Sequence, residues 1–164
     1  MFPAETYIKG LTDSKKITEP FRENTLIDMI YKKALFRMTV VVSAAEIDAF
    51  GVGVMWKRSI VGMAEAAHWW YPNDKIILDG NKLVGLDYVE PVVRADGKFA
   101  SVSAASNIAK YTQCCAMDDL ARRYPRYGFS HNRGYGTPEH RAKLKEHGVC
   151  PDHRMSYNPM KEMV

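Results

Sequence analysis

The residues of this sequence best placed to do chemistry are Asp79 and Gly80, which directly follow the apolar residues 76–78. Such a run is typical of a buried parallel strand. A carboxylate at the end of that strand lies at the sheet edge where open α/β folds bind ligands. Its oxygens suit a hard cation such as Mg²⁺. An ordinary Asp-Gly turn explains the same pair, so both interpretations stay open.

A second polar group is expected on a long helix over residues 103–123. The buried stripe predicted by the helical spacing consists of Ala104, Ile108, Tyr111 and Cys115. A neighbouring face repeats every four residues and consists of Lys110, Cys114, Asp118 and Arg122. That face is either the border of a site or a solvated stripe.

The third group is basic and aromatic and falls in residues 122–154. Its basic members are Arg122, Arg123, Arg126, Arg133, Arg141, Lys143, Lys145 and Arg154, and its aromatic members are Tyr124, Tyr127, Phe129 and Tyr135. Basic side chains meet phosphates, and aromatic rings stack on bases. A solvated basic helix with a self-packed loop explains the pattern equally well.

Composition indicates one globular domain over residues 1–164, with 46% hydrophobic and 26% charged residues and a net charge of +4. No apolar run is long enough to predict a membrane span, and residues 1–10 do not resemble a signal peptide. Cys114, Cys115 and Cys150 are an odd set that argues against disulfides and favours a reducing, cytoplasmic compartment. Combined with His147 and His153, they match no common zinc spacing.

The elements that must position these residues alternate between helix and strand, which predicts an α/β fold. The expected helices cover 18–33, 43–69 (interrupted near glycines 51 and 53), 103–123 and 138–147. Ser43 and Glu46 form a capping box at the start of the second helix, and Thr137 caps the last one, which Gly148 should end. The expected strands lie at 35–42, 75–78 and within 89–103. Three strands make a thin sheet for so many helices, which suggests that sheet neighbours are missing.

Seven short segments, in order and at the right spacing, make the chain resemble the ribonuclease HII family. They are GLTDSKK at 10–16, EID at 46–48, DG at 79–80, SAASNIAK at 103–110, YPRYGF at 124–129, GYGT at 134–137 and HRMSYNP at 153–159. The resemblance implies a ribonuclease H-like mixed sheet flanked by helices. It also implies a C-terminal helical part, residues 124–164, that contacts substrate.

The function implied by this resemblance is endonucleolytic cleavage of the RNA strand in RNA/DNA hybrids, or at ribonucleotides embedded in duplex DNA. Mg²⁺ or Mn²⁺ would assist the hydrolysis. Asp79 corresponds to a catalytic metal ligand, and Tyr135 to a ring that stacks at the RNA–DNA junction. The other implied nucleic-acid contacts are Ser14, Lys15, Lys16, Lys110 and Arg133.

The sequence departs from the family in three places. The family's N-terminal D-E-A-G-R-G segment has no counterpart, so we expect the sheet to lack its first two strands. Cys114 stands where the family has an aspartate, and Asp118, one helical turn further on, is the substitute candidate for binding metal. Asn132-Arg133 replaces His-Lys before GYGT.

These departures leave three hypotheses. The chain is a ribonuclease HII whose start has been misplaced, and a monomer when complete. Alternatively, a separate N-terminal polypeptide completes its sheet by strand addition. In the third hypothesis the chain is a catalytically dead protein that binds hybrids without cutting them. None of the three involves a membrane.

Overall fold

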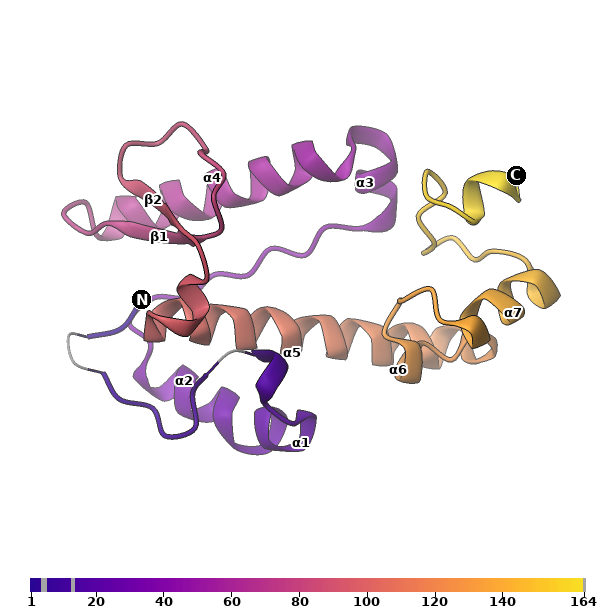
Figure 1. Ribbon diagram of the computed structural model, residues 1–164, viewed down its shortest axis with the longest axis horizontal. Helices are drawn as coiled ribbons and strands as arrows, with labels where there is room; N and C mark the ends of the chain where they lie inside the picture. The colour runs from indigo at the N-terminus through magenta and orange to yellow at the C-terminus, as the bar shows by residue number, and fades with distance from the viewer. Residues whose placement is uncertain (4–5, 13, 164) are drawn as a thin grey trace. The chain divides into compact units, whose positions relative to one another are not determined.

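The computed structural model describes residues 1–3, 6–12 and 14–163. Figure 1 labels its helices and strands. The helices are α1 (Glu19–Phe21), α2 (Ile27–Lys33), α3 (Ala44–Phe50), α4 (Val52–Trp70), α5 (Ala100–Arg123), α6 (Phe129–Asn132) and α7 (Pro138–His147), and the strands are β1 (Ile76–Asp79) and β2 (Val89–Val92). Contacts divide the chain into unit 1, Met1–Val40 with Lys57–Tyr111, and unit 2, Val41–Trp56 with Thr112–Val164.

The core of unit 1 forms where the helical segment from Glu19 to Lys33 packs against the first part of α5. A π-helical turn, Arg22–Leu26, joins α1 to α2, which confirms the helix expected over 18–33 from Glu19 onward. Leu26, Ile27 and Ile30 share one buried face with Ala104 and Ile108 of α5. Burying each large aliphatic side chain contributes about 1.5–3 kcal/mol.

A polar network lies beside this core. The Arg22 side chain is buried and donates to Asn107 Oδ1 (3.3 Å) and to the carbonyls of Ser14 (2.5 Å) and Ile17 (3.0 Å). The Asn107 amide donates to the carbonyls of Thr12 (3.0 Å) and Ser103 (2.9 Å). Segment 103–110 is therefore joined by hydrogen bonds to segment 10–16, which gives two of the sequence motifs a common structural purpose.

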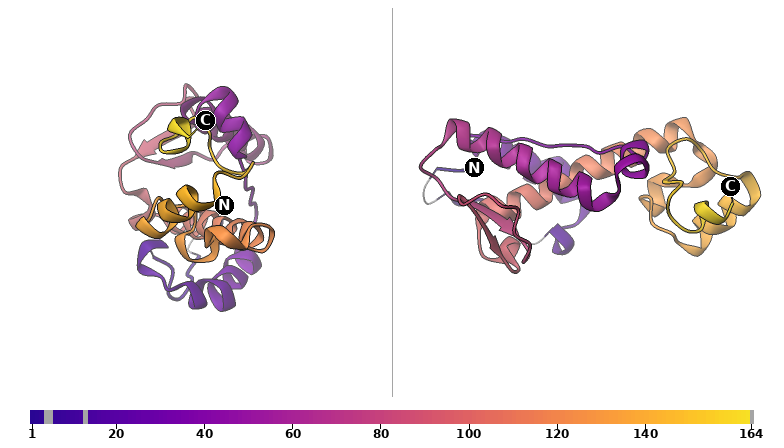
Figure 2. Two further views of the ribbon diagram at one scale, coloured as in Figure 1. Left: turned by 90° about the vertical axis from the view of Figure 1, so that its right-hand side faces the viewer. Right: turned by 90° about the horizontal axis from the view of Figure 1, so that it is seen from above.

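The sheet among the described residues consists of β1 and β2, which pair in parallel (Figures 1 and 2). Ile76 pairs with Val89 and Asp79 with Val92, so Asp79 occupies the last position of the ladder. These bounds confirm the strand expected at 75–78 to within one residue. They also confirm a strand at the start of 89–103.

The strand expected at 35–42 is wrong, because the structure has no strand over these residues. The Leu35 N–H donates to the Met1 carbonyl (3.1 Å), and the Met1 ammonium donates to the Phe36 carbonyl (2.9 Å). The segment from 36 to 43 then runs without ladder pairing to a described neighbour. β-Branched composition favours a strand only when another strand lies alongside. Met38, Val40 and Val41 are consequently exposed.

Unit 2 begins with α3, whose start is the capping box that the sequence predicts. Ser43 Oγ accepts from the Glu46 N–H (3.2 Å), and Glu46 Oε2 accepts from the Ser43 N–H (2.8 Å). Gly51, at φ 81°, separates α3 from α4, as the sequence suggested. Further along, Thr137 caps α7 through the His140 N–H (3.2 Å), and Gly148 ends that helix.

The α3 helix is fixed to the C-terminal segment by one carboxylate. Asp48 accepts from the N–H groups of Met155 (2.7 Å) and Ser156 (3.0 Å) and from the Ser156 hydroxyl (2.5 Å). The hydrogen bonds from Ser156 lower the pKa of the Asp48 carboxyl. The core of this unit contains Tyr127, Phe129 and Leu144.

The stripe expected along α5 is correct in its first half only. Ala104 and Ile108 are buried, but Cys114 is buried and Cys115 exposed, the reverse of the expectation. A helical repeat of 3.6 residues allows a step of three or four after Tyr111. Both steps end on a cysteine, so residue type could not decide between them.

We expect Asn107→Ala to lower the free energy of unfolding by about 3 kcal/mol, because it removes one acceptor of a buried guanidinium and one donor to Thr12. Asn81→Ala is the matched control, since Asn81 is exposed, and it should change stability by less than about 0.5 kcal/mol. Urea unfolding followed by circular dichroism measures both. Equal effects would contradict the structural importance of the Arg22–Asn107 network.

Candidate functional site

Asp79 is exposed at the end of β1, where the sequence places a ligand-binding carboxylate. Its Oδ1 accepts from the Ala95 N–H at 2.8 Å, which holds the carboxylate toward the turn that follows β2. Gly80, at φ 124°, turns the chain away from the strand end. The hydrogen bond fixes the direction of the side chain while the group stays open to solvent. Among the described residues this is a suitable position for one oxygen ligand of a cation.

The other unit 1 candidates gather around the short 3₁₀ turn Ser14–Lys16. Ser14 Oγ lies 3.0 Å from Ser106 Oγ of α5, and the Ser14 carbonyl accepts from Arg22. Lys15 and Lys16 are exposed, whereas Lys110 is half-buried. Because a buried arginine fixes the backbone of this turn, its two lysines can meet a phosphate with little loss of backbone freedom.

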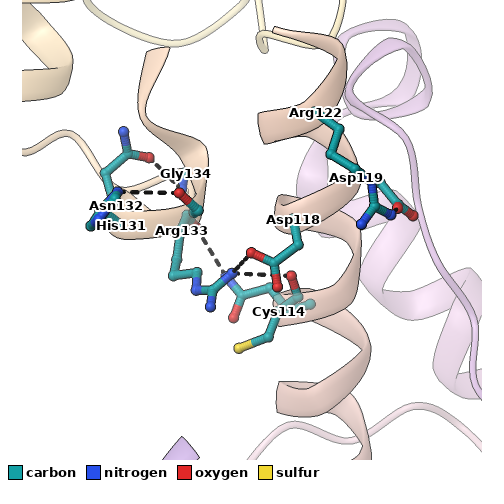
Figure 3. A network of polar contacts seen from close by, with 10 residues as sticks. Cys114, Asp118, Asp119, Arg122, His131, Asn132, Arg133 and Gly134 are labelled. Atoms are coloured by element: carbon teal, nitrogen blue, oxygen red, sulfur yellow. Dashed lines mark hydrogen bonds and ion pairs between the residues drawn. The ribbon is translucent and has the colours of Figure 1, made fainter. Parts of the chain in front are cut away.

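In unit 2, Arg133 connects the loop before GYGT to α5 (Figure 3). Its guanidinium donates to Asp118 Oδ1 (2.5 Å) and to the Cys114 carbonyl (3.2 Å), and its side chain is only 17% exposed. Gln113 Nε2 donates to the Arg133 carbonyl at 3.3 Å. Two residues proposed separately, one for metal and one for phosphate, are therefore ion-pair partners. In this arrangement the Asp118 charge is compensated within the protein.

The loop that follows carries Tyr135 with an exposed ring. Asn132 Oδ1 accepts from the Gly134 N–H (2.9 Å), and the Asn132 amide donates to the Tyr127 carbonyl (2.7 Å). Gly134 has φ 81°, and a Cβ there would come within 3.3 Å of Met117 Sδ, so the position favours glycine. Tyr135 is 62% exposed although its backbone is fixed on both sides. An exposed ring on a rigid loop is a suitable stacking platform.

Beneath this loop lies a buried pair of histidines. His140 Nε2 is 3.2 Å from His153 Nε2, and His140 Nδ1 is 3.0 Å from the Tyr135 carbonyl. The Cys150 N–H donates to His153 Nδ1 at 2.9 Å. Burial lowers the pKa of His153 and raises that of the Cys150 thiol. Both groups are therefore held neutral near pH 7.

The candidates thus separate into two sets. Unit 1 contains Asp79, Ser14, Lys15, Lys16 and Lys110. Unit 2 contains Asp118, Arg133 and Tyr135. Within the described residues no three His, Cys, Asp or Glu side chains come together to hold a metal ion. The described donors therefore do not by themselves fit a Mg²⁺ or Mn²⁺ centre.

Sequence reasoning missed the structural importance of Asn107, His140 and His153. Asn107 could have been noticed because it lies four positions after Ser103, on the inward face of a helix where a polar residue is unusual. The motif at 153–159 marks His153 by resemblance, but nothing in the sequence pairs it with His140, because their thirteen-residue separation follows no helical or strand period.

Comparison with known proteins places these features in a family. The family model described as Ribonuclease HII matches residues 5–160. This chain belongs to the ribonuclease HII family. A ribonuclease HII from Polaromonas sp. (strain JS666 / ATCC BAA-500) is 39% identical over 96% of this chain and 78% of its own length. One from Neisseria meningitidis serogroup C (strain 053442) is 36% identical over 98% of this chain and 82% of its own length.

Other ribonucleases HII are matched over a smaller part of their length. The protein from Geobacillus sp. (strain WCH70) is 37% identical over all of this chain, which spans 58% of that relative. The chain covers 62% of a second relative, from Geobacillus thermodenitrificans (strain NG80-2). It thus spans about three fifths of the length of these ribonucleases HII. None of the helices in the described part combines the length and apolar character that a membrane crossing requires.

The Asp118–Arg133 pair yields a stability prediction. We expect Asp118→Asn to lower the free energy of unfolding by about 1 kcal/mol, because the pair is partly buried and fixes a loop. Asp119→Asn is the control, since the Asp119–Arg122 pair is exposed on both sides and should contribute close to nothing. Paired urea titrations distinguish the two variants. A larger loss for Asp119→Asn would contradict the structural role given to Arg133.

The buried His153 makes unit 2 sensitive to acid. The folded pKa of His153 is below the unfolded value of about 6.5, so the unfolded state binds the proton first. The stabilising contribution is complete above about pH 6.5 and is lost as pH falls from there toward the lower folded pKa. The backbone hydrogen bond with Cys150 and the charge of Asp152 raise the pKa of His153, but burial lowers it by more.

Urea midpoints at about pH 7.5 and about pH 5.5 test this dependence. The midpoint should fall at the lower pH, and His153→Gln should reduce the fall. Asp48 does not contribute in this window, because its lowered pKa keeps it ionised. A midpoint independent of pH between these values would contradict the lowered pKa of His153.

Proposed function

We propose that this chain cleaves the RNA strand of RNA/DNA hybrids, or cuts at ribonucleotides embedded in duplex DNA, as an endonuclease. The observation that carries the proposal is the family match, which runs over residues 5–160 and includes every motif. The structure supports it through the exposed carboxylate of Asp79 at a strand end and the exposed ring of Tyr135 on a fixed loop.

We assign Asp79 the role of one metal-ligating carboxylate, because its oxygens suit Mg²⁺ or Mn²⁺. The hydrogen bond from Ala95 orients the carboxylate and leaves Oδ2 available among the described residues. Bound metal in this chemistry activates water and stabilises the leaving oxygen. Further ligands are needed, since the described residues do not assemble a complete centre.

Nucleic acid would be held by three kinds of contact. Lys15 and Lys16 are exposed for phosphates, and Ser14 shares their turn. Lys110 offers a further ammonium group from α5. Tyr135 stacks on a base or sugar at the junction between RNA and DNA, a contact compatible with any sequence. Arg133 acts mainly through the loop it fixes, because its guanidinium is committed to Asp118 and Cys114.

A second candidate function is binding of hybrids without cleavage. Two observations on α5 favour it. Cys114, at the family's aspartate position, is buried and carries a thiol, a poor ligand for Mg²⁺. Asp118, the substitute candidate, is paired with Arg133. Such a protein would show salt-dependent affinity for hybrids and no turnover.

A third possibility is that strands outside this chain complete the sheet. The two-stranded sheet and the exposed apolar side chains at Met38, Val40 and Val41 favour it. A separate or preceding polypeptide strand could pair along the segment from 36 to 43 and satisfy its backbone groups. The chain would then act as a subunit rather than as a lone monomer.

Cleavage of a labelled DNA duplex that contains one ribonucleotide tests the proposal, with Mg²⁺ and then Mn²⁺. We expect a cut at the ribonucleotide that Asp79→Asn reduces at least about 100-fold, since loss of a charged ligand removes a large electrostatic contribution. Asp74→Asn is the control, because Asp74 is an exposed aspartate that precedes β1. Hybrid binding without any cut would favour the second candidate instead.

A further inference from the structure

Tyr135 presents an exposed ring from a backbone that is fixed by three hydrogen bonds. Its N–H donates to the Asn132 carbonyl at 2.8 Å. Its carbonyl accepts from the Thr137 N–H at 2.8 Å and lies 3.0 Å from His140 Nδ1. The last of these contacts comes from a buried side chain of α7 rather than from the loop itself. The backbone position from which the ring projects is therefore held in part by His140.

The proton positions along this chain follow from its two ends. His153 Nδ1 lies 2.9 Å from the Cys150 N–H, which can only donate, and 3.3 Å from the Cys150 carbonyl, which can only accept. The shorter contact assigns Nδ1 as the acceptor and places the ring proton of His153 on Nε2. That proton is donated to His140 Nε2, 3.2 Å away, which places the His140 proton on Nδ1. The Tyr135 carbonyl can only accept, which is what this tautomer requires. The contact at the Tyr135 end therefore agrees with the shorter contact at the Cys150 end on the same pattern of donors and acceptors.

The surroundings of the pair keep it in place. His140 is 4% exposed and His153 6%. The Phe129 ring meets His140 edge-on with 5.5 Å between centroids, and the Tyr127 ring meets His153 edge-on at 5.0 Å. Rings packed in this way have little freedom to rotate. The hydrogen-bonded chain from Cys150 to Tyr135 is thus a rigid support.

We propose that His140 and His153 are positioning residues for Tyr135: the chain Cys150–His153–His140 fixes the carbonyl of Tyr135 so that its ring meets the nucleic acid at one orientation. This inference rests on the proposed function, in which Tyr135 stacks on the substrate. It adds that stacking depends on a donor at His140 Nδ1, and that His153 selects this tautomer.

Two substitutions of His140 distinguish the effect of its Nδ1 donor from the effect of its ring packing. In His140→Asn the amide nitrogen can take the place of Nδ1 and still donate to the Tyr135 carbonyl. In His140→Gln the amide reaches the place of Nε2, and the donor to Tyr135 is lost. Both remove the ring from the aromatic cluster, so loss of packing alone affects them alike.

The experiment measures the affinity of the full chain for a fluorescein-labelled duplex with one ribonucleotide, without divalent metal so that no cleavage occurs. The variants are Tyr135→Ala, His140→Gln, His140→Asn and Tyr135→Ala combined with His140→Gln. We expect Tyr135→Ala and His140→Gln each to weaken binding about tenfold, the size of one stacking contact. His140→Asn should retain most of the affinity, and the double variant should bind like Tyr135→Ala alone.

Hydrogen exchange of the Thr137 amide, which donates to the same carbonyl, supplies a measurement without nucleic acid. It should become faster in His140→Gln and stay slow in His140→Asn. Equal effects of the two substitutions on exchange and binding, or additive losses in the double variant, would overturn the positioning role. If Tyr135→Ala binds like the wild type, stacking itself is wrong. The exchange data still report whether His140 holds the loop.

Discussion

A buried charge must be surrounded by hydrogen-bond acceptors, and the Arg22 guanidinium imposes this demand on unit 1. Its acceptors come from Ser14, Ile17 and Asn107, so the N-terminal segment, the first helices and α5 must all be in place together. Removing a single acceptor leaves a buried charge partly unsatisfied, which costs more than an ordinary hydrogen bond. The turn that presents Lys15 and Lys16 follows from this arrangement.

The same principle operates in unit 2 with neutral groups and one ion pair. The loop before α7 is held by Arg133 on the α5 side and by His140 on the α7 side. Neither contact involves the Tyr135 ring, which is therefore exposed without being loose. Rigid presentation reduces the entropy lost on binding, so affinity depends on residues that never touch the substrate. Weaker binding after a substitution of Arg133 or His140 would therefore look like the loss of a direct contact with the substrate.

Local signals in the sequence predicted most elements correctly. The capping box at Ser43, the Thr137 cap and the apolar run before Asp79 each depend on neighbouring residues, and each is confirmed. The strand expected at 35–42 failed because strand formation needs a partner that residue type cannot supply. On α5, two adjacent cysteines left the inward position undecided.

The candidate site was less predictable than the fold, because it depends on pairs that are distant in sequence. Asp118 and Arg133 were each assigned a separate external partner, whereas the structure pairs them with one another. The contact between His140 and His153 could not be inferred at all. A single sequence states which groups can titrate or coordinate but not which of them neutralise each other. The roles of Asp79 and Tyr135 remain predictions that follow from the family.

The hydrogen bonds from Met155 and Ser156 to Asp48 span 107 and 108 residues. During synthesis α3 leaves the ribosome long before Met155 and Ser156 do, so Asp48 cannot form these hydrogen bonds until the intervening chain has been made. Unit 2 can therefore close only once Ser156 has been synthesised, whereas the contacts of unit 1 are available by Tyr111. A chain cut short before Met155 would have every contact of unit 1 available while α3 lacked its partner.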